Sequence, residues 1–124
     1  MPSSRNYRIL VVDDIADNLF LLQTFLEAEG FEVETADNGS QALSRISTNL
    51  PDLVLLDVML PDISGYEVTR QIRQNYNLPS LPILLVTAHE QAHAKLGFEA
   101  GANDFIRKPV DFEDLLARIA VFLH

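Results

Sequence analysis

The stretch Leu53-Val54-Leu55-Leu56-Asp57-Val58-Met59-Leu60-Pro61 decides the fold of this chain. Four consecutive apolar residues lead into a carboxylate, and the turn residues Pro61, Asp62 and Gly65 follow. A wholly apolar run of this length predicts a strand buried on both faces, as found inside a parallel sheet. An acid at the carboxyl end of such a strand lies where open α/β sheets place their ligand sites. We therefore take Asp57 as the candidate functional residue.

Four other segments carry strand patterns. Residues 8–12 and 83–86 are almost wholly apolar, so we expect these two strands beside the first one at the centre of the sheet. Residues 31–36 alternate between apolar and acidic residues, and residues 104–107 are short with polar ends, so we expect both at the edges. Amphipathic patterns fill the intervals and predict helices over 16–29, 41–49, 65–74, 90–100 and 112–123, the last with Asp111 as its N-cap.

Strands that alternate with helices form a parallel sheet with helices on both faces. We therefore expect a three-layer α/β domain with a five-stranded parallel sheet and five helices. The strand order 2-1-3-4-5 fits, because it puts the three apolar strands at the centre. In that order the first and third strands are neighbours. Asp13 and Asp14, which follow the first strand, should then lie close to Asp57.

The composition limits the function. The chain has 124 residues, enough for one domain and too few for two, so we expect a single domain over residues 1–124 with a flexible N-terminus over 1–7. The net charge of −9 opposes direct binding to nucleic acid or to anionic membranes. The sequence has no cysteine, and no apolar run approaches the roughly 20 residues that span a bilayer. We expect a cytoplasmic domain.

Three carboxylates at one edge of a sheet repel one another, and a bound cation is the simplest reason to keep them together. Mg²⁺ (or Mn²⁺) takes oxygen ligands, and Mg²⁺ sites commonly combine one or two carboxylates with phosphate oxygens. The two remaining strand ends supply a hydroxyl, Thr87, and a fixed cation, Lys108. Carboxylates, a metal ion, a hydroxyl and an ammonium around one mouth are the groups that phosphoryl transfer to a carboxylate uses.

These motifs together resemble the receiver domain of two-component response regulators. The motifs are Asp13-Asp14, Asp57 followed by Pro61 and Gly65, Thr87-Ala88, and Lys108-Pro109, in this order over nearly the whole chain. The resemblance implies a flavodoxin-like fold and phosphorylation of Asp57 by a histidine kinase or a histidine phosphotransfer protein. It also implies a signalling domain that catalyses only its own phosphorylation and dephosphorylation, and that controls a downstream effector or output domain.

The resemblance also implies a ligand set. Mg²⁺ is expected on Asp14, Asp57 and the backbone carbonyl of Met59, with Asp13 acting through water. Thr87 and Lys108 are expected to contact the phosphoryl group.

The switch is implied in the same way. Thr87 and Phe105 are expected to change position on phosphorylation and to alter the surface of the fourth helix, fifth strand and fifth helix, where a homodimer can form. The bond before Pro109 is expected to be cis. His89, two residues after Thr87, is expected to tune dephosphorylation.

Each of these residues also has a purely structural interpretation. Asp57 can begin a turn, and Asp13-Asp14 can cap the following helix and place an acid in its first turn. Thr87 can be an ordinary strand-end hydroxyl, Lys108 a solvated surface lysine and Phe105 a core aromatic. The occurrence of all of them in one order favours the functional interpretation.

The stretch His89-Glu90-Gln91-Ala92-His93 is an H-E-x-x-H motif and indicates a different function, that of a zinc protease, with Glu113 as a conceivable third ligand. Three observations oppose it. The motif falls in an exposed position just after the fourth strand, no third histidine follows at the usual spacing, and a domain filled by five strand–helix units leaves no substrate cleft. Stoichiometric zinc that is lost in a His93→Ala variant would support it.

Three further classes of protein fit the sequence less well. A receiver-like module that only binds partners usually lacks one of the acids, Thr87 or Lys108, and all are present here. Related phosphotransferases with an aspartate nucleophile carry a second acid two residues later, where this chain has Met59. A flavin-binding flavodoxin would need a neutral phosphate loop in place of the acidic residues 13–17. The chain is expected either to stand alone or to be cut from a larger regulator or hybrid kinase.

Overall fold

The computed structural model describes residues 6–88 and 94–123. The strands are β1 (Arg8–Val12), β2 (Glu32–Ala36), β3 (Leu53–Asp57), β4 (Ile83–Thr87) and β5 (Asp104–Arg107). The helices are α1 (Ala16–Ala28), α2 (Gly39–Thr48), α3 (Gly65–Gln74), α4 (Ala94–Ala100) and α5 (Phe112–Phe122). The alternation of strands and helices is the predicted one.

The five strands form one parallel sheet in the order β2-β1-β3-β4-β5, as predicted. β3 and β4 are buried at every position, whereas β2 is only partly buried, in keeping with its place at the edge. The register pairs Val12 with Leu56 and Asp57 with Val86. The carboxyl ends of the three central strands therefore lie at one level, and the polar residues that end them share one mouth.

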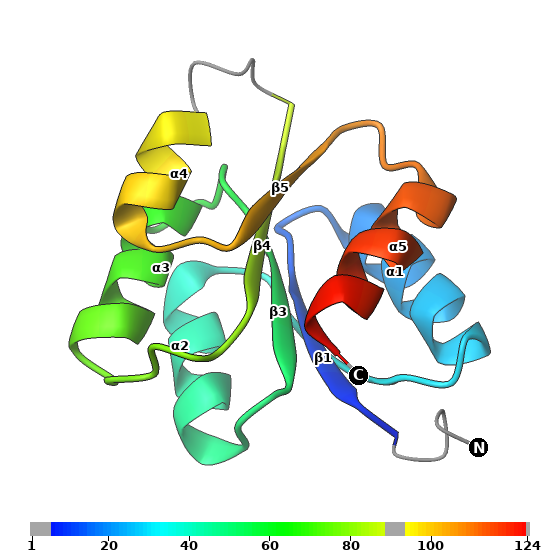
Figure 1. The fold of residues 1–124 in the computed structure, drawn as a ribbon, viewed down its shortest axis with the longest axis horizontal. Coiled ribbons are helices and arrows are strands. Elements are labelled where there is room, and N and C mark those ends of the chain that lie inside the picture. Colours follow the sequence, from blue (N-terminus) through cyan, green and yellow to red (C-terminus); the bar gives the residue numbers. More distant parts are fainter. Residues whose placement is uncertain (1–5, 89–93, 124) are drawn as a thin grey trace.

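The sheet separates two hydrophobic cores. Helices α1 and α5 cover one face, and α2, α3 and α4 cover the other (Figure 1). Alternate residues of each central strand enter opposite cores: Leu56 packs in the core on the α2–α3 face, and Leu55 packs in the core on the α1–α5 face. Because both faces of β3 are covered by helices, consecutive residues of this strand are apolar.

One helix start within the described residues differs from the sequence prediction, and that of α1 agrees with it. α2 begins at Gly39 instead of residue 41, because the Asn38 side chain accepts a hydrogen bond from the Gln41 amide and acts as its N-cap. α1 begins at Ala16, as predicted, and its N-cap residue is Ile15. Neither Asp13 nor Asp14 is therefore the N-cap of α1, which removes one structural interpretation of that pair. Asp111 caps α5 as predicted, accepting from the amides of Glu113 and Asp114.

Three predictions fall on residues 89–93, which lie outside the described residues. They are the start of the fourth helix at residue 90, the role of His89 and the H-E-x-x-H motif.

Candidate functional site

The acidic residues at the strand ends come together as the strand order predicts. Asp57 is the last residue of β3 and Asp13 follows β1; they are only 4% and 3% exposed, whereas Asp14 is exposed. One ligand atom from each of the three residues lies within 4.8 Å of the other two. Among residues 6–88 and 94–123, the buried polar side chains are Asp13, Asp57, Thr69 and Thr87. Three of these four belong to the carboxyl ends of central strands, which marks that edge as the exceptional part of the core.

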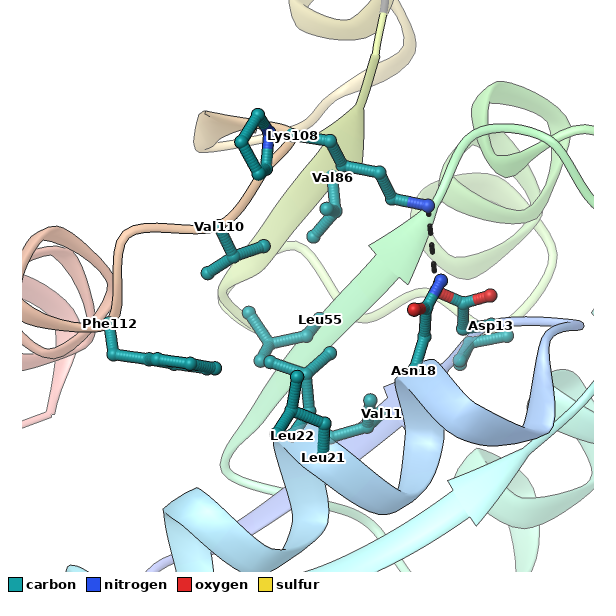
Figure 2. Close-up of a pocket in the computed structure, with 12 residues that line it drawn as sticks. Val11, Asp13, Asn18, Leu21, Leu22, Leu55, Val86, Lys108, Val110 and Phe112 are labelled. Atoms are coloured by element: carbon teal, nitrogen blue, oxygen red, sulfur yellow. Dashed lines mark hydrogen bonds and ion pairs between the residues drawn. The ribbon is translucent and has the colours of Figure 1, made fainter.

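Lys108 supplies the positive charge at this edge. It follows β5 directly, and its ammonium Nζ lies 3.0 Å from Asp57 Oδ2 and 3.6 Å from Asp13 Oδ2. Figure 2 shows the side chain reaching across from the end of β5 towards Asp13. The Lys108–Pro109 peptide bond is cis, as the resemblance implies. One ammonium thus contacts two buried carboxylates, so the cluster keeps an excess of negative charge.

Burial and pairing shift the proton affinities of this cluster. Burial raises the pKa of Asp57, and the hydrogen bonds from Lys108 and from the Met59 amide offset the rise only in part. For Lys108, burial alone would lower the pKa, but the hydrogen bond and charge of Asp57, with a further contribution from Asp13, raise it. The pKa values of both partners are therefore raised, that of Asp57 because it is buried and that of Lys108 because it is paired with two carboxylates.

The other predicted residues take these places. Thr87 ends β4, next to the strand that ends in Asp57, and is buried. Met59 lies two residues beyond Asp57, and its side chain is 63% exposed. Phe105 lies in β5, and its ring packs over the backbone of α4: a Cβ added to Gly97 would lie 2.2 Å from Phe105 Cζ. The ring also meets Phe98 edge to face, with centroids 5.0 Å apart.

The structure adds two groups that the sequence did not indicate. The Ile15 amide donates to Asp13 Oδ1, and Asn18 Nδ2 donates to Asp13 Oδ2. Together they fix the orientation of the Asp13 carboxylate. The spacing contains a signal for Asn18, since the first turn of the helix after a strand returns towards the end of that strand. The bond from Ile15 has no signal, because any residue can supply an amide.

The donor set fits a hard divalent cation. Three carboxylates provide oxygen ligands at one point, the ligand type that Mg²⁺ and Mn²⁺ prefer, and an exposed Asp14 leaves the cluster open on one side. A cation there would reduce the excess negative charge that Lys108 alone does not neutralise.

An apolar pocket adjoins the cluster. It has a volume of about 220 Å³ and lies between α1 and the segment that leads into α5, with the sheet residues Val11, Leu55 and Val86 as its floor (Figure 2). Asp13, Asn18 and Lys108 form its polar end. The polar mouth therefore borders directly on apolar surface. No helix within the described residues is long and apolar enough to cross a membrane.

Known proteins share this sequence and this fold. The chain is 43% identical to the response regulator PleD of Caulobacter vibrioides over 113 residues, covering 90% of the chain and 25% of PleD. It is 44% identical to the alkaline phosphatase synthesis transcriptional regulatory protein PhoP of Bacillus subtilis over 119 residues, covering 95% of the chain and 49% of PhoP. The chain thus spans about half or less of the length of these relatives.

Solved structures agree. A response regulator from Chloroflexus aurantiacus superimposes with a TM-score of 0.90 at 39% identity, covering 94% of this chain and 97% of that one. The response regulator TrrA of Thermotoga maritima, solved in complex with Mg²⁺-BeF, superimposes with a TM-score of 0.85 at 37% identity, covering 94% and 99%. The family model of the response regulator receiver domain matches residues 9–120. The chain therefore belongs to the receiver domain family of two-component response regulators.

Proposed function

We propose that this domain is a phosphoryl-accepting switch in which Asp57 takes the phosphoryl group from a phosphohistidine on a histidine kinase or a histidine phosphotransfer protein. The observation that carries the proposal is the mouth itself. A buried carboxylate has an ammonium 3.0 Å away and two further carboxylates within 4.8 Å. A charge excess of this kind is costly in a core and fits a site that binds a cation and a phosphoryl group.

The chemistry follows from the positions of the residues. A carboxylate oxygen of Asp57 forms a bond to phosphorus while the phosphorus–nitrogen bond of the phosphohistidine breaks, and the electron pair returns to the imidazole. Asp13, Asp14, Asp57 and the Met59 carbonyl would hold Mg²⁺ (or Mn²⁺), which neutralises phosphoryl oxygens when bound. Lys108 provides a second, fixed positive charge, and the Thr87 hydroxyl donates to a phosphoryl oxygen.

The response to phosphorylation involves the far edge of the sheet. A phosphoryl group on Asp57 attracts Thr87 and Lys108, and the packing of Phe105 over α4 changes with them. The surface of α4, β5 and α5 then favours a second form, which is a shift in the population of two states. Leu96 and Phe98 on α4 and Val121 on α5 are 49%, 51% and 62% exposed, so this surface already offers apolar contacts to an effector, an output domain or a second copy of the chain.

The signal is expected to leave the domain through a protein contact. The relatives are about two to four times as long as the matched segment, which supports control of an output domain or a separate effector. The net charge of −9 opposes direct contact with nucleic acid. We propose no catalysis beyond phosphorylation and dephosphorylation of Asp57.

An Asp57→Asn variant tests the proposal. It removes the nucleophile while keeping the shape of the side chain, so labelling by a small phosphodonor in the presence of Mg²⁺ should disappear, whereas circular dichroism should stay unchanged. Asp52→Asn is the matched control, because it makes the same change just before the other end of β3 and should leave labelling intact. Undiminished labelling of Asp57→Asn would contradict the proposal.

A further inference from the structure

The loop between β3 and α3, residues 58–64, carries the Met59 carbonyl. Its start is bonded to β4, and its end is bonded back to its start. The Val58 amide donates to the Val86 carbonyl at 3.2 Å, and the Gly65 amide donates to the Val58 carbonyl at 2.9 Å. The Met59 amide bonds the Asp57 carboxylate at 3.1 Å. These bonds fix the start and the end of the loop, and they leave open what holds its middle in place.

The middle of the loop is attached to α2. Asp62 Oδ1 accepts from the Gly39 amide and Asp62 Oδ2 from the Ser40 amide, both at 2.8 Å, across 23 and 22 residues of sequence. These amides open α2, where the first N–H groups of a helix have no intrahelical acceptor and the helix dipole favours an anion. The pKa of Asp62 is lowered: its slight burial acts in the other direction, but the amide bonds dominate. The carboxylate is therefore a specific partner of this helix end.

An apolar contact lies beside the two hydrogen bonds of Asp62. Ile63 packs directly on the start of α2, since a Cβ added to Gly39 would lie 2.5 Å from Ile63 Cγ1 and 2.9 Å from Val68 Cγ2. Any larger residue at position 39 would have to displace the Ile63 and Val68 side chains from the start of α2. Glycine is therefore needed here for close approach. Asp62 and Ile63 together seat the loop on α2, and we call this contact the loop latch.

We propose that Asp62 is a positioning residue, whose carboxylate fixes the loop on the N-terminus of α2 and thereby holds the Met59 carbonyl in place for Mg²⁺. The inference rests on the proposed function, because it takes Met59 as a ligand. Asp62 itself is exposed and lies three residues from Met59, so it acts through the backbone of the loop and not as a ligand.

The test is a Mg²⁺ titration of the unphosphorylated protein, followed by the NMR shifts of the backbone amides at Val58 and Met59. Asp62→Ala should raise the Mg²⁺ dissociation constant by about tenfold, at the weak end of the effects of residues behind the ligands. Asp62→Asn keeps one acceptor oxygen and should give an intermediate value. Gly39→Ala breaks the latch without changing a charge, and should weaken binding in the same direction.

Two controls separate positioning from simpler effects. Asn38→Ala removes the other cap of the same helix end without touching the loop, and should lower the melting temperature by about 3 to 6 °C while leaving the Mg²⁺ affinity within about twofold. Asp17→Asn removes one negative charge from the first turn of α1, three residues from Asp14, and measures how much a lost charge near the site weakens Mg²⁺ binding by itself.

The outcomes distinguish the two proposals. An Asp62→Ala effect no larger than that of Asn38→Ala or Asp17→Asn, in a wild type that binds Mg²⁺, would overturn the positioning role and leave the proposed function standing. A wild-type protein without saturable Mg²⁺ shifts would overturn both. If Asp62→Ala does not fold, Asp62→Asn and Gly39→Ala decide the question.

Discussion

The two ends of the sheet carry the same kinds of charged residue and use them in opposite ways. At the carboxyl end, Lys108 faces two buried carboxylates, and burial raises the pKa of Asp57. At the amino end, the Arg73 guanidinium donates all of its described hydrogen bonds to neutral acceptors. It bonds the carbonyls of Leu78, Leu81 and Gly101 and the side-chain oxygen of Asn103, at 2.6 to 3.0 Å.

The charged residues at the amino end of the sheet stabilise the fold, whereas those at the carboxyl end fit a ligand site. Arg73 ties the end of α3 to the loop before β4 and to the turn before β5, and all of its described partners are neutral, so its bonds stabilise the fold. The carboxyl end has more acid than one lysine can neutralise, which costs stability. We interpret this loss of stability as the consequence of a site that must bind a cation and a phosphoryl group. Removal of an acid at the carboxyl end should therefore stabilise the fold, whereas removal of Lys108 there or of Arg73 at the amino end should destabilise it.

The largest effect is expected at the amino end. Arg73→Ala leaves three carbonyls and an amide oxygen without this donor, and should lower the free energy of unfolding by about 3 kcal/mol. Urea denaturation measures it. Arg73→Lys is the control: one ammonium cannot reach all four acceptors, so it should recover less than half of the loss. A loss below about 1 kcal/mol would show that the amino end does not depend on this residue.

The sequence predicted the residues at the carboxyl end of the sheet better than the contacts at its amino end. β3 and β4 were predictable because short continuous apolar runs bounded by turn residues favour strands buried on both faces, and the strand order then placed Asp13 near Asp57. The role of Arg73 was not predictable. In the sequence it is one of several polar residues of an amphipathic helix, and its acceptors lie up to 30 residues away.

The same limit applies within the site. That Asp13, Asp14, Asp57 and Lys108 gather follows from topology, because each comes directly at the end of a strand. The latch formed by Asp62 does not, since two loops must fold before its carboxylate meets α2. Local patterns therefore predict which residues end the strands, and tertiary contacts decide what holds the loops between them.

Lys108→Met sharpens the comparison at the carboxyl end. Without its ammonium, the buried carboxylates of Asp13 and Asp57 lose their shared cation, and the free energy of unfolding without Mg²⁺ should fall by about 2 kcal/mol. Mg²⁺ should narrow the gap to the wild type, because a bound cation replaces part of the missing charge. Urea curves with and without Mg²⁺ measure both effects. A gap that Mg²⁺ leaves unchanged would mean that the ion does not bind beside these acids.

Asp57→Asn should have the opposite sign, raising the free energy of unfolding by about 1 kcal/mol in the absence of metal. The native state holds the Asp57 proton more tightly than the unfolded state, whose pKa is near 3.8. The free energy of unfolding of the wild type therefore falls as pH rises from 3.8 through the pKa of Asp57 in the folded state. Above that folded-state pKa the whole loss of stability is present. The difference between the two proteins should accordingly be small in acid and grow towards neutral pH. A variant less stable than the wild type at neutral pH would contradict this interpretation of Asp57.

The smallest effect is expected from Arg8, the first residue of β1 at the amino end. Its Nη2 lies 3.3 Å from Glu32 Oε1, but the two side chains are 31% and 54% exposed, and its amide bond to Asp52 survives a change of side chain. Arg8→Ala should therefore cost less than about 0.5 kcal/mol, and a double-mutant cycle with Glu32→Ala measures the pair alone. A cost above about 1 kcal/mol that disappears at high salt would mean that Arg8 acts over a distance on the acidic excess of the whole domain. In that case the two ends of the sheet are coupled by charge, and the amino end also offsets part of the cost of the site.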